Sequence, residues 1–140
     1  MNNTFKTEIL TILKPEQMVY LSTCVNNQPR VRPVTLMYND AGFFIATGVN
    51  DAKVAQIAAN PKIEICLLLK SDTNAGYVRA RGSLTIITNT DMRKAIYDCH
   101  HFLSHYWKES TNPDYVLYQM DWKVVEYMKP GDDLAISFDW

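Results

Sequence analysis

The stretch from Gln28 to Pro61 restricts the fold of this chain more than any other part of the sequence. Two β-branched and aromatic runs flank a turn at residues 39–42, Asn-Asp-Ala-Gly, which is the composition of a hairpin. The second run leads into a helical segment that Asn50 or Asp51 caps and that Asn60-Pro61 ends. Two strands therefore deliver the chain to a helix N-terminus, where free N–H groups and the helix dipole favour an anion.

Lys53 lies in the first turn of this expected helix, where its charge opposes the dipole. A bound anion explains that placement better than helix stability does; a solvated lysine on an exposed helix face is the alternative. Arg30, Arg32 and Thr47 complete the group, and Arg32 and Thr47 can lie near the same end of the hairpin, beside this helix. An arginine fork, an ammonium and a hydroxyl together suit a phosphate dianion. The residues alone leave this phosphate site and an unrelated group of surface charges equally open.

The rest of the chain consists of short apolar segments separated by turns. The expected helices are residues 4–13 and a segment capped by Asn89 or Thr90, with an apolar stripe that continues to Tyr106 or Trp107. The expected strands are residues 18–25, 31–36, 43–47, 63–69, 77–88 and 120–128. So many strands with few helices between them favour an antiparallel barrel or an α+β sheet over repeated βαβ units.

Some of these segments carry further expectations. Pro33 cannot donate to a sheet ladder, so it belongs at an edge, at a bulge or beside something other than a strand. The continuous apolar run 63–69 predicts burial on both faces, and Gly82 predicts a bulge or a close backbone approach. Residues 114–118 are expected to form a short helical turn, and residues 134–140 an apolar tail.

Composition bounds the class of protein. The 140 residues are most simply one domain, and a net charge of −1 gives no basic excess for nucleic acid. The first residues lack a signal-peptide pattern, and no apolar run approaches the ~20 residues of a membrane span. Cys24, Cys66 and Cys99 are odd in number and far apart, which predicts reduced core thiols in a cytoplasmic protein.

Several pieces of the sequence occur in an order that resembles a known family. They are the strand Pro-Arg-Val-Arg-Pro-Val at 29–34, the strand Gly-Phe-Phe-Ile-Ala-Thr at 42–47, Lys53 with Ile57, Asn60 and Pro61 after it, and Val78 before Gly82. In this order the chain resembles the FMN-binding split barrels related to pyridoxamine 5′-phosphate oxidase, over residues 18–88 and more loosely over the last strand. The resemblance implies a six-stranded antiparallel Greek-key split barrel with flanking helices, a homodimer, and FMN held at the dimer interface.

The resemblance also assigns cofactor-binding positions, residue by residue. Arg32 and Lys53 match the basic residues on the FMN phosphate, and Thr47 matches a residue beside the phosphate and the ribityl chain. The strand whose backbone faces the isoalloxazine ring corresponds to Pro33, Val34 and Thr35. Tyr77 falls where larger family members keep a polar residue that touches the ring.

The chain departs from the family pattern in two respects. Asn50, Asp51 and Ala52 stand where family members often have a serine and a second basic residue, and a carboxylate at Asp51 would repel a phosphate. The chain is also shorter than the vitamin oxidase and lacks its basic C-terminal segment that clamps the substrate. Oxidation of pyridoxine phosphate is therefore not expected, and the general-stress and nitroimidazole-resistance relatives are closer.

Two further groups of residues bear on function. His101 and His105 are four apart, as metal-binding pairs on a helix are, but no third ligand stands at a matching spacing, so no metal is predicted. The many aromatic residues of the C-terminal third are expected in the core or at a dimer interface. For Trp140 the alternative is a position folded over the flavin or substrate pocket.

The sequence thus predicts a cytoplasmic, homodimeric FMN flavoprotein that passes electrons from a reduced nicotinamide cofactor to a small acceptor. The cofactor supplies the hydride chemistry in such enzymes, so no catalytic acid or base is named. One alternative is a flavin carrier or redox sensor without enzymatic activity. Another keeps the barrel but places a deazaflavin or haem in it, for which the histidine cluster is the one supporting feature.

Overall fold

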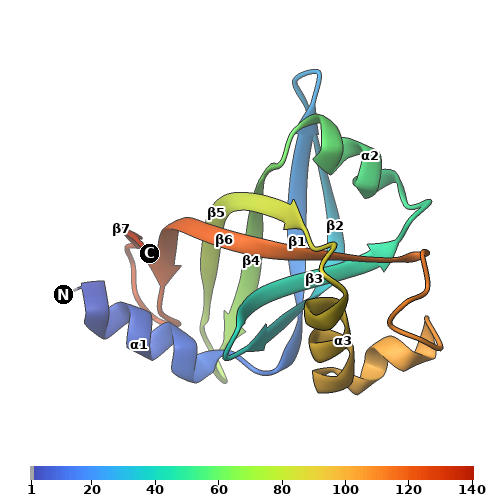
Figure 1. The fold of residues 1–140 in the computed structure, drawn as a ribbon. Helices are drawn as coiled ribbons and strands as arrows, with labels where there is room; N and C mark the ends of the chain where they lie inside the picture. Colours follow the sequence, from blue (N-terminus) through green and yellow to red (C-terminus); the bar gives the residue numbers. More distant parts are fainter. Residues whose placement is uncertain (1) are drawn as a thin grey trace.

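A computed structural model of the chain describes residues 2–140 (Figure 1). Its helices are α1 (Asn2–Ile12), α2 (Ala52–Ala59), α3 (Thr90–Cys99) and the 3-10 helix η1 (His101–His105). Its strands are β1 (Glu16–Val25), β2 (Gln28–Asn39), β3 (Gly42–Gly48), β4 (Lys62–Lys70), β5 (Ala75–Ile86), β6 (Tyr115–Met128) and β7 (Ile136–Asp139). None of the helices in this described range is long and apolar enough to cross a membrane.

The strands form one antiparallel sheet in the order β3-β2-β1-β4-β5-β6-β7, and β3 pairs in addition with β6. This extra pairing closes β1 to β6 into the antiparallel barrel that the sequence predicted. One edge of β6 pairs with β3 over its first half and with β7 near its end, from Val124 to Tyr127. The strand β7 is therefore an addition to the expected six, formed by residues that the sequence analysis assigned to an apolar tail.

The hairpin of β2 and β3 is paired only beside its turn, at Met37–Phe44, Tyr38–Phe43 and Asn39–Gly42. Beyond these pairs β3 leaves β2 and runs along β6, whereas β2 stays paired with β1 from Gln28 to Met37 (Figure 1). Around Pro33 the strand β2 therefore has a partner on one side and an open edge on the other. This is one of the three placements expected for the proline, and the opening between the two strands becomes important below.

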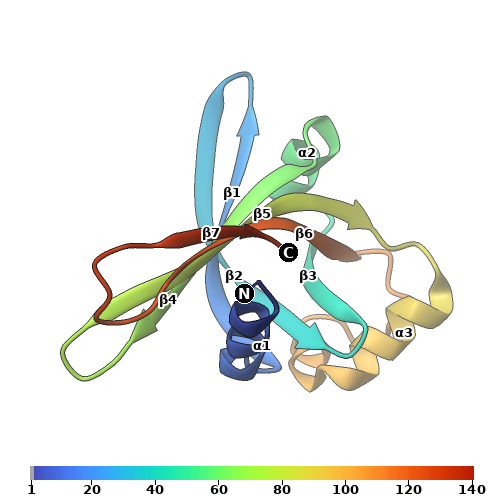
Figure 2. The ribbon, with the colours of Figure 1, turned by 90° about the vertical axis from the view of Figure 1, so that its left-hand side faces the viewer.

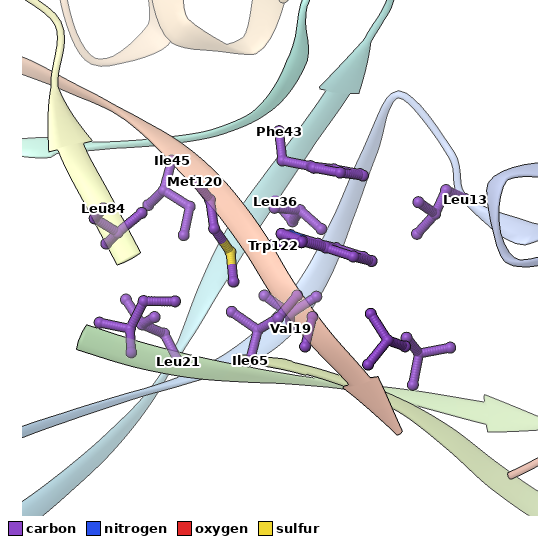
Figure 3. Packing of buried hydrophobic residues seen from close by; sticks show 14 of the residues in the cluster. Leu13, Val19, Leu21, Leu36, Phe43, Ile45, Ile65, Leu84, Met120 and Trp122 are labelled. Atoms are coloured by element: carbon purple, nitrogen blue, oxygen red, sulfur yellow. The ribbon is translucent and has the colours of Figure 1, made fainter. Parts of the chain in front are cut away.

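The hydrophobic core has two parts, one on each face of the barrel wall. The larger part fills the barrel, where Phe43 stacks on Trp122 with their ring centroids 4.0 Å apart (Figure 3). The smaller part packs the outer face of β3 and β6 against α3 and η1, through Phe44, Leu117 and Leu103 among others. The first residues of β6 are thus buried on both faces.

The helix α1 lies across one side of the barrel, next to the last strands of the sheet (Figure 2). Phe5 packs on Tyr127 and Phe138, with ring centroids 6.4 and 6.1 Å apart. Trp140 packs on Trp122 at 4.8 Å and has the ammonium of Lys6 over its ring at 4.8 Å. Trp140 therefore packs among the aromatic side chains beside α1. In its own chain it does not take the alternative position over the pocket of the expected flavin.

Three expectations about local structure are wrong. The run 63–69 is not buried on both faces, because side chains alternate and Leu68 is 54% exposed. Residues 114–118 do not form a helical turn, since Tyr115 begins the long strand β6. The third helix does not continue to Trp107 but ends at Cys99, after which η1 follows in a tighter 3-10 geometry.

The cysteines are also less buried than expected, because Cys99 is exposed and Cys24 and Cys66 are half-buried. Other local predictions are confirmed. Asn89 caps α3 by accepting a hydrogen bond from the N–H of Met92. Gly82 marks a bulge, where the register between β5 and β6 shifts and where a Cβ atom would lie 1.8 Å from the carbonyl oxygen of Asp121.

Candidate functional site

A pocket of about 460 Å³ opens where β2 and β3 separate. Its floor comes from the two strands, one side from the start of α2, and the other side from η1 and the residues that follow it. The lining residues are Pro33, Val34, Thr35, Ala46, Thr47, Gly48, Asp51, Lys53, Phe102, Leu103, Tyr106 and Trp107. The pocket has the size of a small-molecule site, with a few polar groups at one end and apolar and aromatic side chains at the other.

Lys53 is the buried charge of this pocket, with 8% of its surface exposed. Its Nζ donates a hydrogen bond to Thr47 Oγ1 at 2.9 Å and lies 2.8 Å from Asp51 Oδ1. A buried ammonium needs such partners, because removing it from water is costly unless it is paired. Lys53 is therefore not the solvated surface lysine that the sequence left open as an alternative.

Asp51 has two roles at this helix terminus. It is the N-cap of α2, since its Oδ1 accepts a hydrogen bond from the N–H of Lys53 at 3.0 Å, and it pairs with the ammonium of the same residue. The hydrogen bond from Lys53 and the charges of Lys53 and Arg32 hold the pKa of the Asp51 carboxyl below its ordinary value, against a smaller opposing effect of burial. The carboxylate is therefore ionised at neutral pH.

Arg32 lies beside the pocket rather than in its lining. Its guanidinium donates to Thr23 Oγ1 at 2.9 Å, to the carbonyl oxygen of Leu21 at 3.3 Å and to the side-chain oxygen of Gln56 on α2. Burial lowers the pKa of Arg32, while the nearby Asp51 carboxylate raises it. The hydrogen bond to Gln56 ties β2 to α2, so Arg32 helps to fix the helix that carries Lys53.

The structure brings together most of the residues predicted to bind a cofactor. Five of them line the pocket, namely Pro33, Val34, Thr35, Thr47 and Lys53, and Arg32 adjoins it. Tyr77 lies elsewhere: its hydroxyl donates to Glu126 Oε2 at 2.7 Å, and Arg79 binds the same carboxylate oxygen. Tyr77 is not among the residues that line the pocket of its own chain.

One wall of the pocket was missed as a site by sequence reasoning. Leu103, Tyr106 and Trp107 were assigned to a helical stripe or to the core, and Phe102 was given no role. All four face the opening between β2 and β3. The break at His100 turns them there. His100 is 1% exposed and its Nε2 lies 3.0 Å from Asn39 Nδ2, so this contact joins the wall to β2. Nδ1 lies 3.3 Å from Glu16 Oε2 but forms no hydrogen bond.

The histidine pair has a different geometry from the one the sequence suggested. His101 and His105 are exposed and belong to a 3-10 helix, in which residues four apart do not share a face as they do in an α-helix. Across residues 2–140 no three histidine, cysteine, aspartate or glutamate side chains lie close enough together to hold a metal ion.

A larger and more open groove, of about 600 Å³, lies on another part of the barrel. It forms between β1 and β4, which pair only from Tyr20 to Ser22, and extends over β5 and β6. Its charged residues are of both signs, Lys62, Arg81 and Lys123 with Glu64. None of the seven predicted cofactor-binding residues lines it, so the pocket between β2 and β3 is the candidate site.

The closed antiparallel barrel and the pocket at its open hairpin define a split-barrel protein with a candidate small-molecule site. The family profile described as "Pyridoxamine 5'-phosphate oxidase" matches residues 5–129 of the chain. The chain therefore belongs to the pyridoxamine 5′-phosphate oxidase-like family, as the sequence motifs indicated. No curated protein matches the chain.

Solved structures share the fold at low sequence identity. General stress protein 26 from Bacillus anthracis str. Sterne is 20% identical, with a TM-score of 0.76 over 97% of this chain and 98% of its own. An FAD-binding protein from Mesorhizobium loti is 18% identical, with a TM-score of 0.68 over 89% and 90%. A heme binding protein from Mycobacterium smegmatis is 14% identical, with a TM-score of 0.73 over 89% of this chain and 53% of its own.

Proposed function

We propose that the chain is a flavoprotein that binds FMN between β2 and β3 and passes electrons from a reduced nicotinamide cofactor to a small acceptor. The observation that carries the proposal is the pairing of a buried cation, Lys53, with an apolar and aromatic remainder in one pocket. A phosphate ester on a flat aromatic ring system has this distribution of polarity. The FAD-binding relative supports a flavin as the ligand.

The residues of the pocket fit such a ligand. Lys53 and Thr47 supply an ammonium and a hydroxyl for phosphate oxygens, and Arg32 holds α2 in place behind them. Val34, Phe102 and Trp107 supply apolar surface for a ring system and exclude water from it. Bound FMN would supply the hydride and electron chemistry, while this chain supplies binding, orientation and electrostatics.

The proposal includes a homodimer in the cytoplasm. Tyr77 lies away from the pocket of its own chain, so it can reach a flavin ring only if that ring is held by a second copy. Light scattering should give twice the mass of 16.1 kDa, and Tyr77→Phe should alter the flavin spectrum without changing that mass. A monomer that binds FMN fully would remove the dimer from the proposal and leave the pocket in it.

The proposal is tested by titrating the purified protein with FMN and with riboflavin while flavin fluorescence is recorded. We expect saturable binding of both, with FMN the tighter ligand because only FMN carries the phosphate. The loaded protein is then mixed with NADH or NADPH and a panel of small acceptors. Bleaching of the flavin by the nicotinamide and its recovery with an acceptor support an oxidoreductase. A flavin that stays oxidised supports the carrier or sensor alternative, and no flavin binding at all refutes the proposal.

Haem is the second candidate, and one observation favours it. The exposed imidazoles of His101 and His105 belong to η1, whose Phe102 and Leu103 line the pocket. An imidazole is an ordinary axial ligand of haem iron, and the structural relative from Mycobacterium smegmatis is a heme binding protein. A Soret band on haem titration that is lost in the double variant His101→Ala, His105→Ala would support haem. The same titration with a deazaflavin tests the remaining alternative.

A further inference from the structure

The cation expected to hold the phosphate already has a negative partner within the chain. Lys53 Nζ lies 2.8 Å from Asp51 Oδ1, and the same oxygen accepts the backbone N–H of Lys53 at 3.0 Å. These two donors, an ammonium and a free N–H at the start of α2, are the groups that an anion at this helix terminus would use. Asp51 therefore occupies the anion position from inside the protein.

The two partners of this ion pair differ in their freedom to move. The Lys53 side chain is 10% exposed and is held by Thr47 Oγ1, so it stays in the pocket. The Asp51 side chain is 45% exposed and lies at the rim of the pocket. Rotation of the Asp51 carboxylate into water requires no opening of the core, whereas withdrawal of Lys53 would leave a buried hydroxyl without its donor.

The charges around the site also favour displacement of the Asp51 carboxylate by a phosphate. Lys53 and Arg32 are positive and Asp51 is negative, and Asp51 acts on both cations. A phosphate dianion that enters while the Asp51 carboxylate remains beside Lys53 is repelled by that carboxylate at short range. Once the carboxylate turns out to solvent, the dianion faces the Lys53 ammonium and the vacated N–H of Lys53, with Arg32 nearby.

We propose that Asp51 is a displaceable internal anion that competes with phosphate for Lys53 and so determines how strongly the pocket prefers a phosphorylated flavin over an unphosphorylated one. This inference rests on the proposed function, because it deepens the role of the same pocket. Asp51 is a specificity-determining residue in this view, and its contribution acts on the phosphate end of the ligand alone.

The variant Asp51→Asn separates the two roles of the residue. Asparagine is as good an N-cap as aspartate, so the start of α2 is preserved while the competing charge is removed. We expect the dissociation constant for FMN to fall about fivefold, the scale of one charge–charge contact at about 4 Å in water, and that for riboflavin to stay within about twofold. Asp51→Ser, which also retains a capping oxygen, should give the same direction.

The matched control is Asp121→Asn, which removes a carboxylate that pairs with Lys123 at 2.7 Å on an exposed part of β6. Asp121→Asn changes the net charge by the same amount and should leave both flavin affinities unchanged. Equal FMN affinity in Asp51→Asn and the native protein overturns the inference. So does an equal gain for FMN and riboflavin, because the effect would then not belong to the phosphate.

A second measurement decides the inference even if no flavin binds. The melting temperature is recorded with increasing inorganic phosphate at constant ionic strength, with chloride as the replaced salt. We expect phosphate to raise the melting temperature of Asp51→Asn more than that of the native protein and of Asp121→Asn. Equal shifts in all three proteins refute the competition, whereas absence of flavin binding alone refutes only the proposed function.

Discussion

Replacing Lys53 by methionine tests the candidate site most directly, because it removes the charge and keeps an unbranched side chain that is only one atom shorter. In the native protein the ammonium is buried, pairs with Asp51 at 2.8 Å and donates to Thr47 at 2.9 Å. Substituting an apolar group for one member of a buried pair is costly only if the other member stays buried. Asp51 is 45% exposed and keeps its place as the N-cap, so water can solvate it.

We therefore expect Lys53→Met to lower the free energy of unfolding by only about 1 kcal/mol, chiefly because the Thr47 hydroxyl loses its donor. The effect on FMN should be larger. A hydrogen bond to a charged group contributes about 1.5–3 kcal/mol, or roughly a 10- to 150-fold change in affinity. Because the Asp51 carboxylate must first turn away from the native ammonium, the lower end of this range, about tenfold, is the expected loss.

The assay is a pair of fluorescence titrations, with FMN and with riboflavin, on Lys53→Met and on the native protein. Urea denaturation of both proteins reports the free energy of unfolding. Lys94→Met, which removes an exposed lysine paired with Asp98 on α3, is the control for a change in net charge. Riboflavin affinity should not change in either variant. An unaltered FMN affinity in Lys53→Met, or an equal loss for FMN and riboflavin, would show that Lys53 does not bind the phosphate.

Two further predictions concern the barrel. Gly82→Ala should destabilise the protein by about 2–4 kcal/mol in urea denaturation, because the new Cβ would meet the carbonyl oxygen of Asp121 at 1.8 Å and force the bulge apart; a change below about 0.5 kcal/mol would contradict this. The Tyr77 hydroxyl and Arg79 hold the pKa of Glu126 in the folded protein below its ordinary value. The stability that this carboxylate contributes is therefore fully present above the ordinary pKa and is lost as the pH falls through the lower pKa of the folded protein. Glu126→Gln should make stability less dependent on pH in that acidic range, and an unchanged pH profile would show that the carboxylate contributes nothing.

Sequence reasoning found the parts of the fold whose signals are local. The hairpin turn, the caps at Asp51 and Asn89, and the bulge at Gly82 each depend on the chemistry of one or two residues. The phosphate-site hypothesis came from the same kind of signal, a lysine in the first turn of a helix that follows a hairpin. These features could be predicted because neighbouring residues decide them.

The start of β6 shows why other parts could not be predicted. Residues Tyr115 to Tyr118 are all buried, since alternate side chains enter the barrel core and the cluster under α3. Burial on both faces removes the alternation by which an antiparallel strand is recognised. The partners that bury the outer face come from α3 and η1, and no local pattern reveals them.

The aromatic wall of the pocket escaped prediction for a related reason. The stripe from Met92 onward continues past residue 99 with helical spacing, and nothing local requires the helix to stop there. The helix ends at His100, whose buried ring lies 3.0 Å from Asn39 Nδ2, a residue distant in the sequence. A long-range contact of one histidine thus accompanies the break that brings Tyr106 and Trp107 to the pocket.

The packing of α1 against the last strands has a consequence for biosynthesis. Tyr127, which contacts both Phe5 and Glu8, follows Glu8 by 119 residues. At the usual speed of translation this separation corresponds to roughly 6 to 24 s during which the helix lacks its contacts with Tyr127. A helix of 11 residues is marginal on its own, and Phe5 stays without this aromatic partner throughout that interval. The first helix to be synthesised is therefore among the last elements to reach its final place.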